Sequence, residues 1–263
     1  MIPVALSTSS VYPRGPEHAF AMAADLGYDG VEVLVTGNST SRDASALFGL
    51  QQRFGVPVLA IHAPTLLLTQ QVWGGAWKKI QRSALLAHGL GCDVVVAHPP
   101  FRWQGRYASG FEEGVRRANE SYGVRIAVEN MYPWRARGRE AQMYLPHWDP
   151  VPMDYRYVTW DFSHAAIDRV DSLAAVQALG ERLTHVHLCD GTDTASDQHL
   201  EPGQGSQPVQ ETLRHLAATG FTGSVAAEIS TRKWRKEPGE VERILARTLA
   251  FARENLAQDA EQA

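Results

Sequence analysis

Cysteine, basic charge and long hydrophobic runs are all scarce in this chain of 263 residues. The two cysteines, Cys92 and Cys189, are too few for a disulfide framework, which favours a reducing compartment. No apolar run approaches the ~20 residues of a membrane helix, and the start, MIPVALSTSS, does not resemble a signal peptide. A net charge of −4 indicates no overall basic surface for nucleic acid. We therefore expect a cytoplasmic protein with no membrane partner.

Short β-prone segments alternate with longer amphipathic segments along nearly the whole chain. Strands are expected at residues 4–7, 31–35, 58–62, 94–98, 125–129, 157–161, 183–188 and 224–228. Helices are expected at residues 17–26, 44–54, 77–90, 111–121, 172–179, 209–218 and 240–255. Eight strands separated by helices predict a parallel sheet with right-handed crossovers.

The chain length decides between two architectures for such a sheet. About 33 residues per unit fits a single (β/α)₈ TIM barrel with its active site at the carboxyl ends of the strands. We predict one barrel domain over residues 1–255 and a frayed tail over residues 256–263. A doubly wound open sheet is the alternative architecture. No sequence pattern indicates the oligomeric state.

Six consecutive predicted strands, from the third to the eighth, end in a residue that can bind a metal. Their spacings of 26 to 41 residues each correspond to about one βα unit, so the side chains should converge at the barrel mouth. The six residues are His62, His98, Glu129, Asp161, His187 and Glu228.

Three further residues extend this set. His164 follows Asp161 in the segment DFSH, and Asp197 and His199 lie in the long connection after the seventh strand. A single histidine at a strand end is more often a hydrogen-bonded core residue, but nine donors at one end of a barrel predict a metal site. Mixed imidazole and carboxylate ligands favour one to three Zn²⁺ ions, with Mn²⁺ as the alternative. His185 should lie deeper in the barrel with a structural role.

These motifs resemble the xylose isomerase-like TIM barrel superfamily, which includes sugar phosphate isomerases and epimerases and endonuclease IV-type AP endonucleases. In the isomerases and epimerases, one metal is held by residues that match Glu129, Asp161, His187 and Glu228 here. The endonuclease IV pattern adds the motifs HAP at 62–64, HPP at 98–100, DFSH at 161–164 and DQHLEPGQG at 197–205. The resemblance therefore implies that all nine positions of a trinuclear zinc site are occupied.

The chain departs from both patterns at specific positions. Thr65 follows the HAP motif where AP endonucleases place an aromatic residue that probes the DNA stack. The segment from Cys189 to Asp197 contains no arginine, whereas tagatose epimerase-type enzymes place one shortly after the histidine of the seventh strand. Nucleic acid is therefore an improbable partner, and a small sugar or sugar phosphate is preferred.

Two mechanisms follow from the resemblance, and neither requires a nucleotide cofactor. In an isomerase or epimerase, Glu129 and Glu228 bind the metal and act as the catalytic acid–base pair, while His164 contacts the substrate. Asn130, Arg102 and Trp103 are further candidates for substrate binding. In a phosphoester hydrolase, Glu129 bridges two metal ions that activate water, and all nine ligands are used. The third possibility is a non-catalytic barrel that binds a metal or a sugar.

Overall fold

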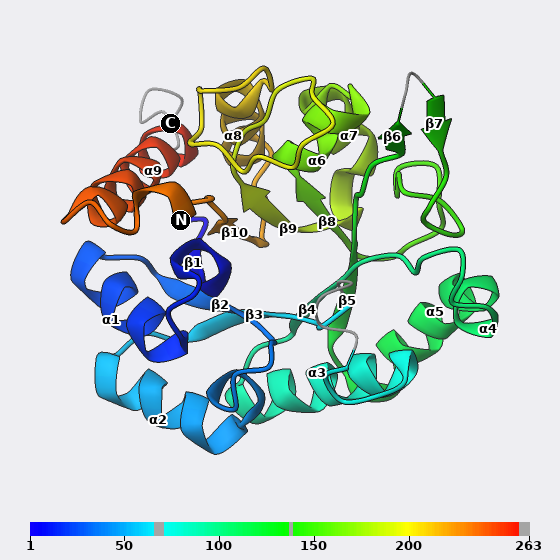
Figure 1. The fold of residues 1–263 in the computed structure, drawn as a ribbon, viewed down its shortest axis with the longest axis horizontal. Helices are drawn as coiled ribbons and strands as arrows, with labels where there is room; N and C mark the ends of the chain where they lie inside the picture. The colour runs from blue at the N-terminus through cyan, green and yellow to red at the C-terminus, as the bar shows by residue number, and fades with distance from the viewer. Residues whose placement is uncertain (66–70, 137–138, 258–263) are drawn as a thin grey trace.

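The computed structural model describes residues 1–65, 71–136 and 139–257, and in it eight parallel strands close into a barrel (Figure 1). Each strand pairs with the next along the chain, and β1 pairs with β10 to close the ring. This closure confirms the TIM barrel and excludes the open sheet. The barrel strands are β1 (Val4–Ser7), β2 (Gly30–Leu34), β3 (Val58–His62), β4 (Val94–Ala97), β5 (Arg125–Glu129), β8 (Val158–Asp161), β9 (Leu183–Leu188) and β10 (Ser224–Ala227).

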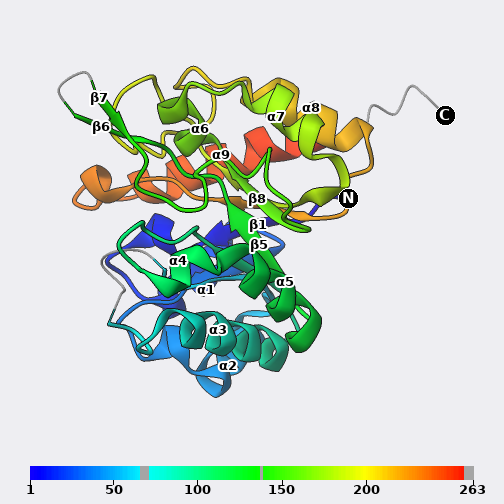
Figure 2. The same cartoon turned by 90° about the vertical axis from the view of Figure 1, so that its right-hand side faces the viewer.

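Helices cover the outside of the barrel, as Figures 1 and 2 show. They are α1 (Pro16–Leu26), α2 (Ala44–Phe54), α3 (Ala76–Leu90), α4 (Arg106–Ser109), α5 (Phe111–Tyr122), α6 (Phe162–Asp168), α7 (Ser172–Leu179), α8 (Val209–Ala218) and α9 (Glu240–Leu256). Short 3₁₀ turns occur at η1 (Thr8–Val11), η2 (Thr40–Arg42), η4 (Gly180–Arg182) and η5 (Arg232–Trp234). None of the helices in the described residues is both long and apolar enough to cross a bilayer.

The main hydrophobic core lies between the strands and the surrounding helices. Fully buried Phe20 of α1 and Trp160 of β8 are among its largest side chains. Burying a side chain of this size contributes about 1.5–3 kcal/mol to the free energy of unfolding. Glycines with left-handed backbone angles follow α1, α2, α3 and α5, which stops each helix so that the chain can turn into the next strand.

The structure adds elements that hydrophobic periodicity did not indicate. Helix α6 begins directly after β8, because the Asp161 side chain accepts a hydrogen bond from the backbone of His164 and caps the helix. A hairpin of β6 (Trp134–Ala136) and β7 (Arg139–Ala141) projects from the connection after β5, on the side of the molecule away from the N-terminus (Figure 2). Helix α9 ends at Leu256, and most of the expected tail, residues 258–263, lies outside the described residues.

Two glycines provide a test of close packing in this fold. A Cβ atom on Gly223, just before β10, would lie 2.1 Å from the Thr184 carbonyl oxygen, whereas one on Gly49 in α2 meets nothing within 4 Å. We expect Gly223→Ala to lower the free energy of unfolding by about 1–3 kcal/mol through overpacking. The matched variant Gly49→Ala should raise it by about 0.5–1 kcal/mol, because alanine favours a helix interior. Urea denaturation measures both, and equal effects would contradict the packing seen at Gly223.

Candidate metal centre

The polar side chains inside the barrel gather at the carboxyl ends of the strands. Residues two apart on a strand share a face, so Ala127 and Glu129 of β5 both face the same side, as do His185 and His187 of β9. Towards the carboxyl ends of the strands these faces carry the ligand residues Glu129 and His187, and His185 lies one step deeper on the same face as His187. The structure brings together all nine residues expected from the sequence: His62, His98, Glu129, Asp161, His164, His187, Asp197, His199 and Glu228.

The first ligand group surrounds the imidazole of His187. Its Nδ1 atom lies 2.9 Å from Glu129 Oε1, 2.9 Å from Glu228 Oε2 and 3.6 Å from Asp161 Oδ2. One donor atom from each of these four residues lies within 4.8 Å of the others. This set, one imidazole nitrogen and three carboxylates, could hold a Zn²⁺, Mn²⁺ or Fe²⁺ ion.

A second group uses the other oxygen of Glu129. Glu129 Oε2 lies 2.8 Å from His98 Nε2 and 3.3 Å from His62 Nε2. His62 ends β3, and His98 immediately follows β4. Because the two oxygens of Glu129 face different groups, this carboxylate is placed to bridge two ions.

The third group consists of His164, Asp197 and His199. His164 Nε2 lies 3.3 Å from Asp197 Oδ2, and His199 Nε2 lies 3.1 Å from Asp197 Oδ1. Ser163 holds the connection in place, because its hydroxyl donates to Asp197 Oδ1 at 2.7 Å and accepts from the backbone of His199. The long connection after β9 thus folds back over the mouth, as its length indicated.

Asp190 organises that connection from below. Its carboxylate accepts hydrogen bonds from the backbone N–H groups of Gly191, Gly203, Gly205 and Gln207. A Cβ atom on Gly205 would lie 2.2 Å from Asp190 Oδ1, so the close approach requires glycine. Asp190 thus orders the whole connection after β9, and both glycines of the GQG motif donate to its carboxylate.

Sequence reasoning missed Glu32, a fully buried carboxylate in the middle of β2. Glu32 Oε2 lies 2.9 Å from His185 Nε2 and 3.0 Å from His187 Nε2, and Oε1 accepts a hydrogen bond from the Ser7 hydroxyl. An ionised carboxylate only accepts, so both Nε2 atoms carry protons and His187 presents Nδ1 to the first ligand group. The available signal was a lone acidic residue between the apolar Val31 and Val33, which in a barrel strand must face the interior.

His185 lies at the level expected for it, below the ligand groups. It is fully buried, and its Nδ1 is 2.8 Å from the Ser224 hydroxyl. Burial lowers the pKa of His185, although its bond to Glu32 opposes that effect. The residue ties β9 to β10 and β2 beneath the candidate metal centre.

Three carboxylates of the centre, Glu32, Glu129 and Glu228, are ionised although burial opposes their charge. Burial alone would raise the pKa of Glu32, Glu129 and Glu228. The neighbouring histidines, above all His187, instead hold the pKa of Glu32 and Glu129 well below its ordinary value and lower that of Glu228 to about 2. The cluster is therefore rich in negative charge at neutral pH.

Several histidines balance that charge by binding protons. Burial would lower the pKa of His187, but Glu32, Glu228 and Glu129 hold it well above 6.5. In the same way, Asp161 and Asp197 raise the pKa of His164 to about 10 against the effect of burial. In the protein without bound cations, these protons occupy positions that divalent ions would take.

The contact between Glu129 and His98 fits a shared cation better than a hydrogen bond. Glu129 Oε2 is buried without a hydrogen-bond partner, although His98 Nε2 is only 2.8 Å away. The two atoms therefore do not point along a shared N–H bond. Atoms this close but misaligned are arranged as ligands of a common ion.

The residues expected to bind substrate lie at the rim. Trp103 is half exposed and stacks on Phe101, with ring centroids 4.6 Å apart and an interplanar angle of 5°. Arg102 beside it is exposed. Asn130 is buried instead, and its side-chain amide bonds in both directions with the backbone of Asp161. Asn130 therefore orders a ligand-bearing strand.

The fold and the ligand groups together define a (β/α)₈ barrel with a histidine–carboxylate centre at the mouth. The chain belongs to the xylose isomerase-like TIM barrel family, whose model matches residues 20–255. This match confirms the resemblance seen in the motifs.

Individual relatives agree with that assignment. An uncharacterized protein of Mycobacterium leprae (strain TN) is 44% identical over 273 residues, which cover 96% of this chain and 97% of the relative. Fructoselysine 3-epimerase of Escherichia coli O157:H7 is 25% identical over 238 residues, which cover 82% of this chain and 86% of the enzyme. The crystal structure of IolI protein with a bound zinc atom superposes with a TM-score of 0.68 at 17% identity, covering 97% of this chain and 98% of that one. The chain is therefore related to sugar epimerases.

The position of Glu32 predicts an effect on metal affinity. Glu32→Gln removes the negative charge that both imidazole N–H groups contact and leaves one neutral amide oxygen to accept from them, so His187 is oriented less strongly. We expect metal affinity to fall about 10- to 100-fold. Competition with a chelating dye measures it, and Glu120→Gln on the exposed face of α5 is the control. Unchanged affinity in a folded Glu32→Gln protein would contradict the orienting role.

The raised pKa values of His164 and His187 predict that metal binding releases protons. A ligating imidazole must give up the proton on its donor nitrogen, so at pH 7 we expect release of about one proton per ion or more. Because the ion and the protons compete for the same nitrogen atoms, a lower proton concentration favours the ion, so affinity should increase between pH 6 and pH 8. Calorimetric titration in two buffers with different ionisation enthalpies measures the release. Binding enthalpies that are the same in both buffers would contradict it.

Proposed function

We propose that this protein is a metal-dependent isomerase or epimerase that acts on a small sugar or sugar phosphate. The observation that carries the proposal is the first ligand group, in which Glu129 and Glu228 both approach His187 Nδ1 at 2.9 Å. The relationship to fructoselysine 3-epimerase supports the same reaction class.

Glu129, Asp161, His187 and Glu228 would hold the ion, with zinc preferred and manganese as the alternative. A bound divalent ion polarises neighbouring carbonyl and hydroxyl oxygens of a sugar and stabilises the negative charge that develops when a C–H proton is removed. The proposed reaction requires no nucleotide cofactor.

Glu129 and Glu228 are placed to move the proton. They lie on β5 and directly after β10, with β8 and β9 between them in the barrel, so they reach a bound sugar from different sides. Both are ionised, which suits a base. One carboxylate takes the proton from carbon, the electron pair moves towards the adjacent carbonyl oxygen, and the other carboxylate, once protonated, returns a proton to the opposite face.

The surrounding residues would hold the substrate. His164 presents Nε2 toward the mouth beside Asp197 and would donate to a substrate oxygen. Trp103 and Arg102 would cover the sugar from the rim. Arg135 of the hairpin is engaged with Glu140 and with the Ile167 carbonyl, so it is not offered as a phosphate ligand.

A second candidate, hydrolysis of a small phosphoester, is favoured by the other two ligand groups. His62, His98 and the shared Glu129 would hold one additional ion, and His164, Asp197 and His199 another. Adjacent ions supply an activated water and stabilise charge on the attacking and leaving oxygens of a phosphoester. The net charge of −4 makes a small substrate more suitable than an extended nucleic acid.

The deciding experiment combines metal analysis with solvent exchange. The wild-type protein, incubated with ketoses and ketose phosphates in D₂O, should incorporate deuterium at the epimerised carbon. Glu129→Gln should lose metal and reduce exchange at least ~100-fold while its circular dichroism is unchanged. Metal content that is unchanged in Glu129→Gln would refute the assignment of the centre.

The double variant His62→Asn/His98→Asn separates the two reactions. An epimerase that uses the first group should keep one ion and most of its exchange activity. A hydrolase should lose an ion and most of its turnover of phosphoesters. Elemental analysis without a histidine tag, together with both assays, distinguishes them, and wild-type protein purified in parallel is the control.

A further inference from the structure

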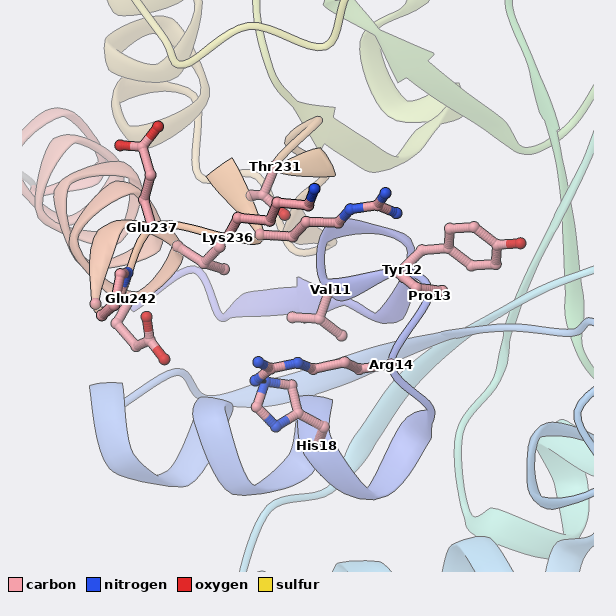
Figure 3. Close-up of a pocket in the computed structure, with 13 residues that line it drawn as sticks. Val11, Tyr12, Pro13, Arg14, His18, Thr231, Lys236, Glu237 and Glu242 are labelled. Carbon is pink, nitrogen blue, oxygen red and sulfur yellow. Dashed lines mark hydrogen bonds between the residues drawn. The ribbon is translucent and has the colours of Figure 1, made fainter. Parts of the chain in front are cut away.

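A second cavity lies beside the barrel mouth, between the connection that follows β1 and the one that follows β10 (Figure 3). Its volume is about 330 Å³. We call it the Arg14 cavity. Its lining includes Arg14, His18, Thr231, Arg235, Lys236 and Glu242. None of them belongs to the three ligand groups.

The Arg14 cavity carries positive charge that is not neutralised nearby. Within the described residues, no carboxylate lies within ion-pair distance of Arg14, Arg235 or Lys236. Surface arginines elsewhere are commonly paired, as Arg53 is with Glu17 at 2.6 Å. Cations without an ion-pair partner that line one concave surface favour an anionic ligand.

The interaction between Arg14 and His18 strengthens this charge distribution. Arg14 Nη1 lies 2.8 Å from His18 Nε2, so the guanidinium donates to a neutral imidazole. Burial and the Arg14 charge both lower the pKa of His18, although Glu242 opposes them. Arg14 therefore keeps its full charge, and its other N–H groups remain available to a ligand.

Two carboxylates also line the cavity, but neither neutralises its centre. Figure 3 shows Glu237 pointing away from the space between Arg14 and Lys236, and Glu242 at its edge. Helix α9 adds to the positive field, because it begins beside the cavity after Gly239 with no side-chain cap. Val241 and Glu242 in its first turn line the cavity, where helix N–H groups lack intrahelical acceptors.

The Arg14 cavity is fixed relative to the metal centre by a short segment. Thr231 follows Glu228 by three residues, so at ~3.5 Å per residue it lies no more than about 10 Å away. The Thr231 hydroxyl donates to the Ser10 carbonyl, and the backbone of Ser230 donates to the His199 carbonyl at 2.8 Å. One molecule with a sugar at one end and an anion at the other could therefore reach both places.

We propose that the Arg14 cavity binds an oxyanion of the phosphate or carboxylate type. Arg14 offers a planar set of N–H donors that suits two oxygens at once, while Lys236 and Arg235 add charge from the other side. The anion is either the distal group of the substrate or a free anion. Binding at the distal group rests on the proposed function, whereas anion binding in the cavity does not.

Binding of inorganic phosphate to the metal-free protein tests the cavity. Removing metal with a chelator prevents phosphate from binding at the ligand groups. Wild-type protein should bind phosphate at millimolar concentrations by calorimetry, and Arg14→Gln/Lys236→Gln should bind it at least ~10-fold more weakly. Arg82→Gln/Lys78→Gln on α3 removes the same charge from another exposed surface and should bind like the wild type. Absence of binding to the wild type, or equal loss in both double variants, would overturn the proposal.

A second measurement identifies the source of the anion. If it belongs to the substrate, Arg14→Gln/Lys236→Gln should raise KM for a sugar phosphate at least ~10-fold and leave KM for the matching free sugar unchanged. If KM for both is unchanged while phosphate binding is lost, the cavity binds a free anion. Failure of the proposed function would appear separately, as a lack of exchange activity in a wild-type protein that still binds phosphate.

Discussion

The imidazole of His187 is held between two sets of buried carboxylates, and the candidate centre depends on that contact. Glu32 binds its Nε2 from inside the barrel, while Glu129 and Glu228 approach Nδ1 from the mouth. These groups come from β2, β5, β9 and the end of β10, which only a closed barrel brings to one axis. Burying several charges costs free energy unless each charge has a partner. The His187 imidazole and the surrounding carboxylates therefore stabilise one another.

Glu129 makes the centre larger than a single ligand group. Its two oxygens face His187 on one side and the pair His62 and His98 on the other. The first ligand group uses only one of these oxygens. The two additional histidines therefore offer donor atoms that could hold a second ion beside the first group.

Apolar and charged residues occupy different parts of the barrel rim around this centre. Trp103 stacks on Phe101 after β4, whereas Arg14 and Lys236 line a cavity between the connections after β1 and β10. Although the net charge of the chain is −4, positive charge is concentrated in the Arg14 cavity. Aromatic and positively charged surfaces thus lie at different places around the same barrel mouth.

The barrel fold and the nine candidate ligands could be predicted from the sequence alone. Alternation of strands and helices is a local property, and β3, β5 and β9 begin and end where their residue patterns predict. Residues at successive strand ends converge in any such barrel, so His62 to Glu228 could be recognised without coordinates. Helix α6 was not predicted from the sequence. It is only seven residues long, and the Asp161 side chain that caps it fixes where it begins.

The division of these residues among the ligand groups depends on the tertiary structure. Nothing in the chain order shows that Glu129 faces two groups, or that Glu32 lies beneath His187 from a strand 155 residues away. The Arg14 cavity likewise joins segments from the two ends of the chain, Val11–His18 and Thr231–Glu242. Periodicity along a strand tells which side a residue faces, but contacts across the barrel depend on strand register and closure, which arise only when all eight strands have paired.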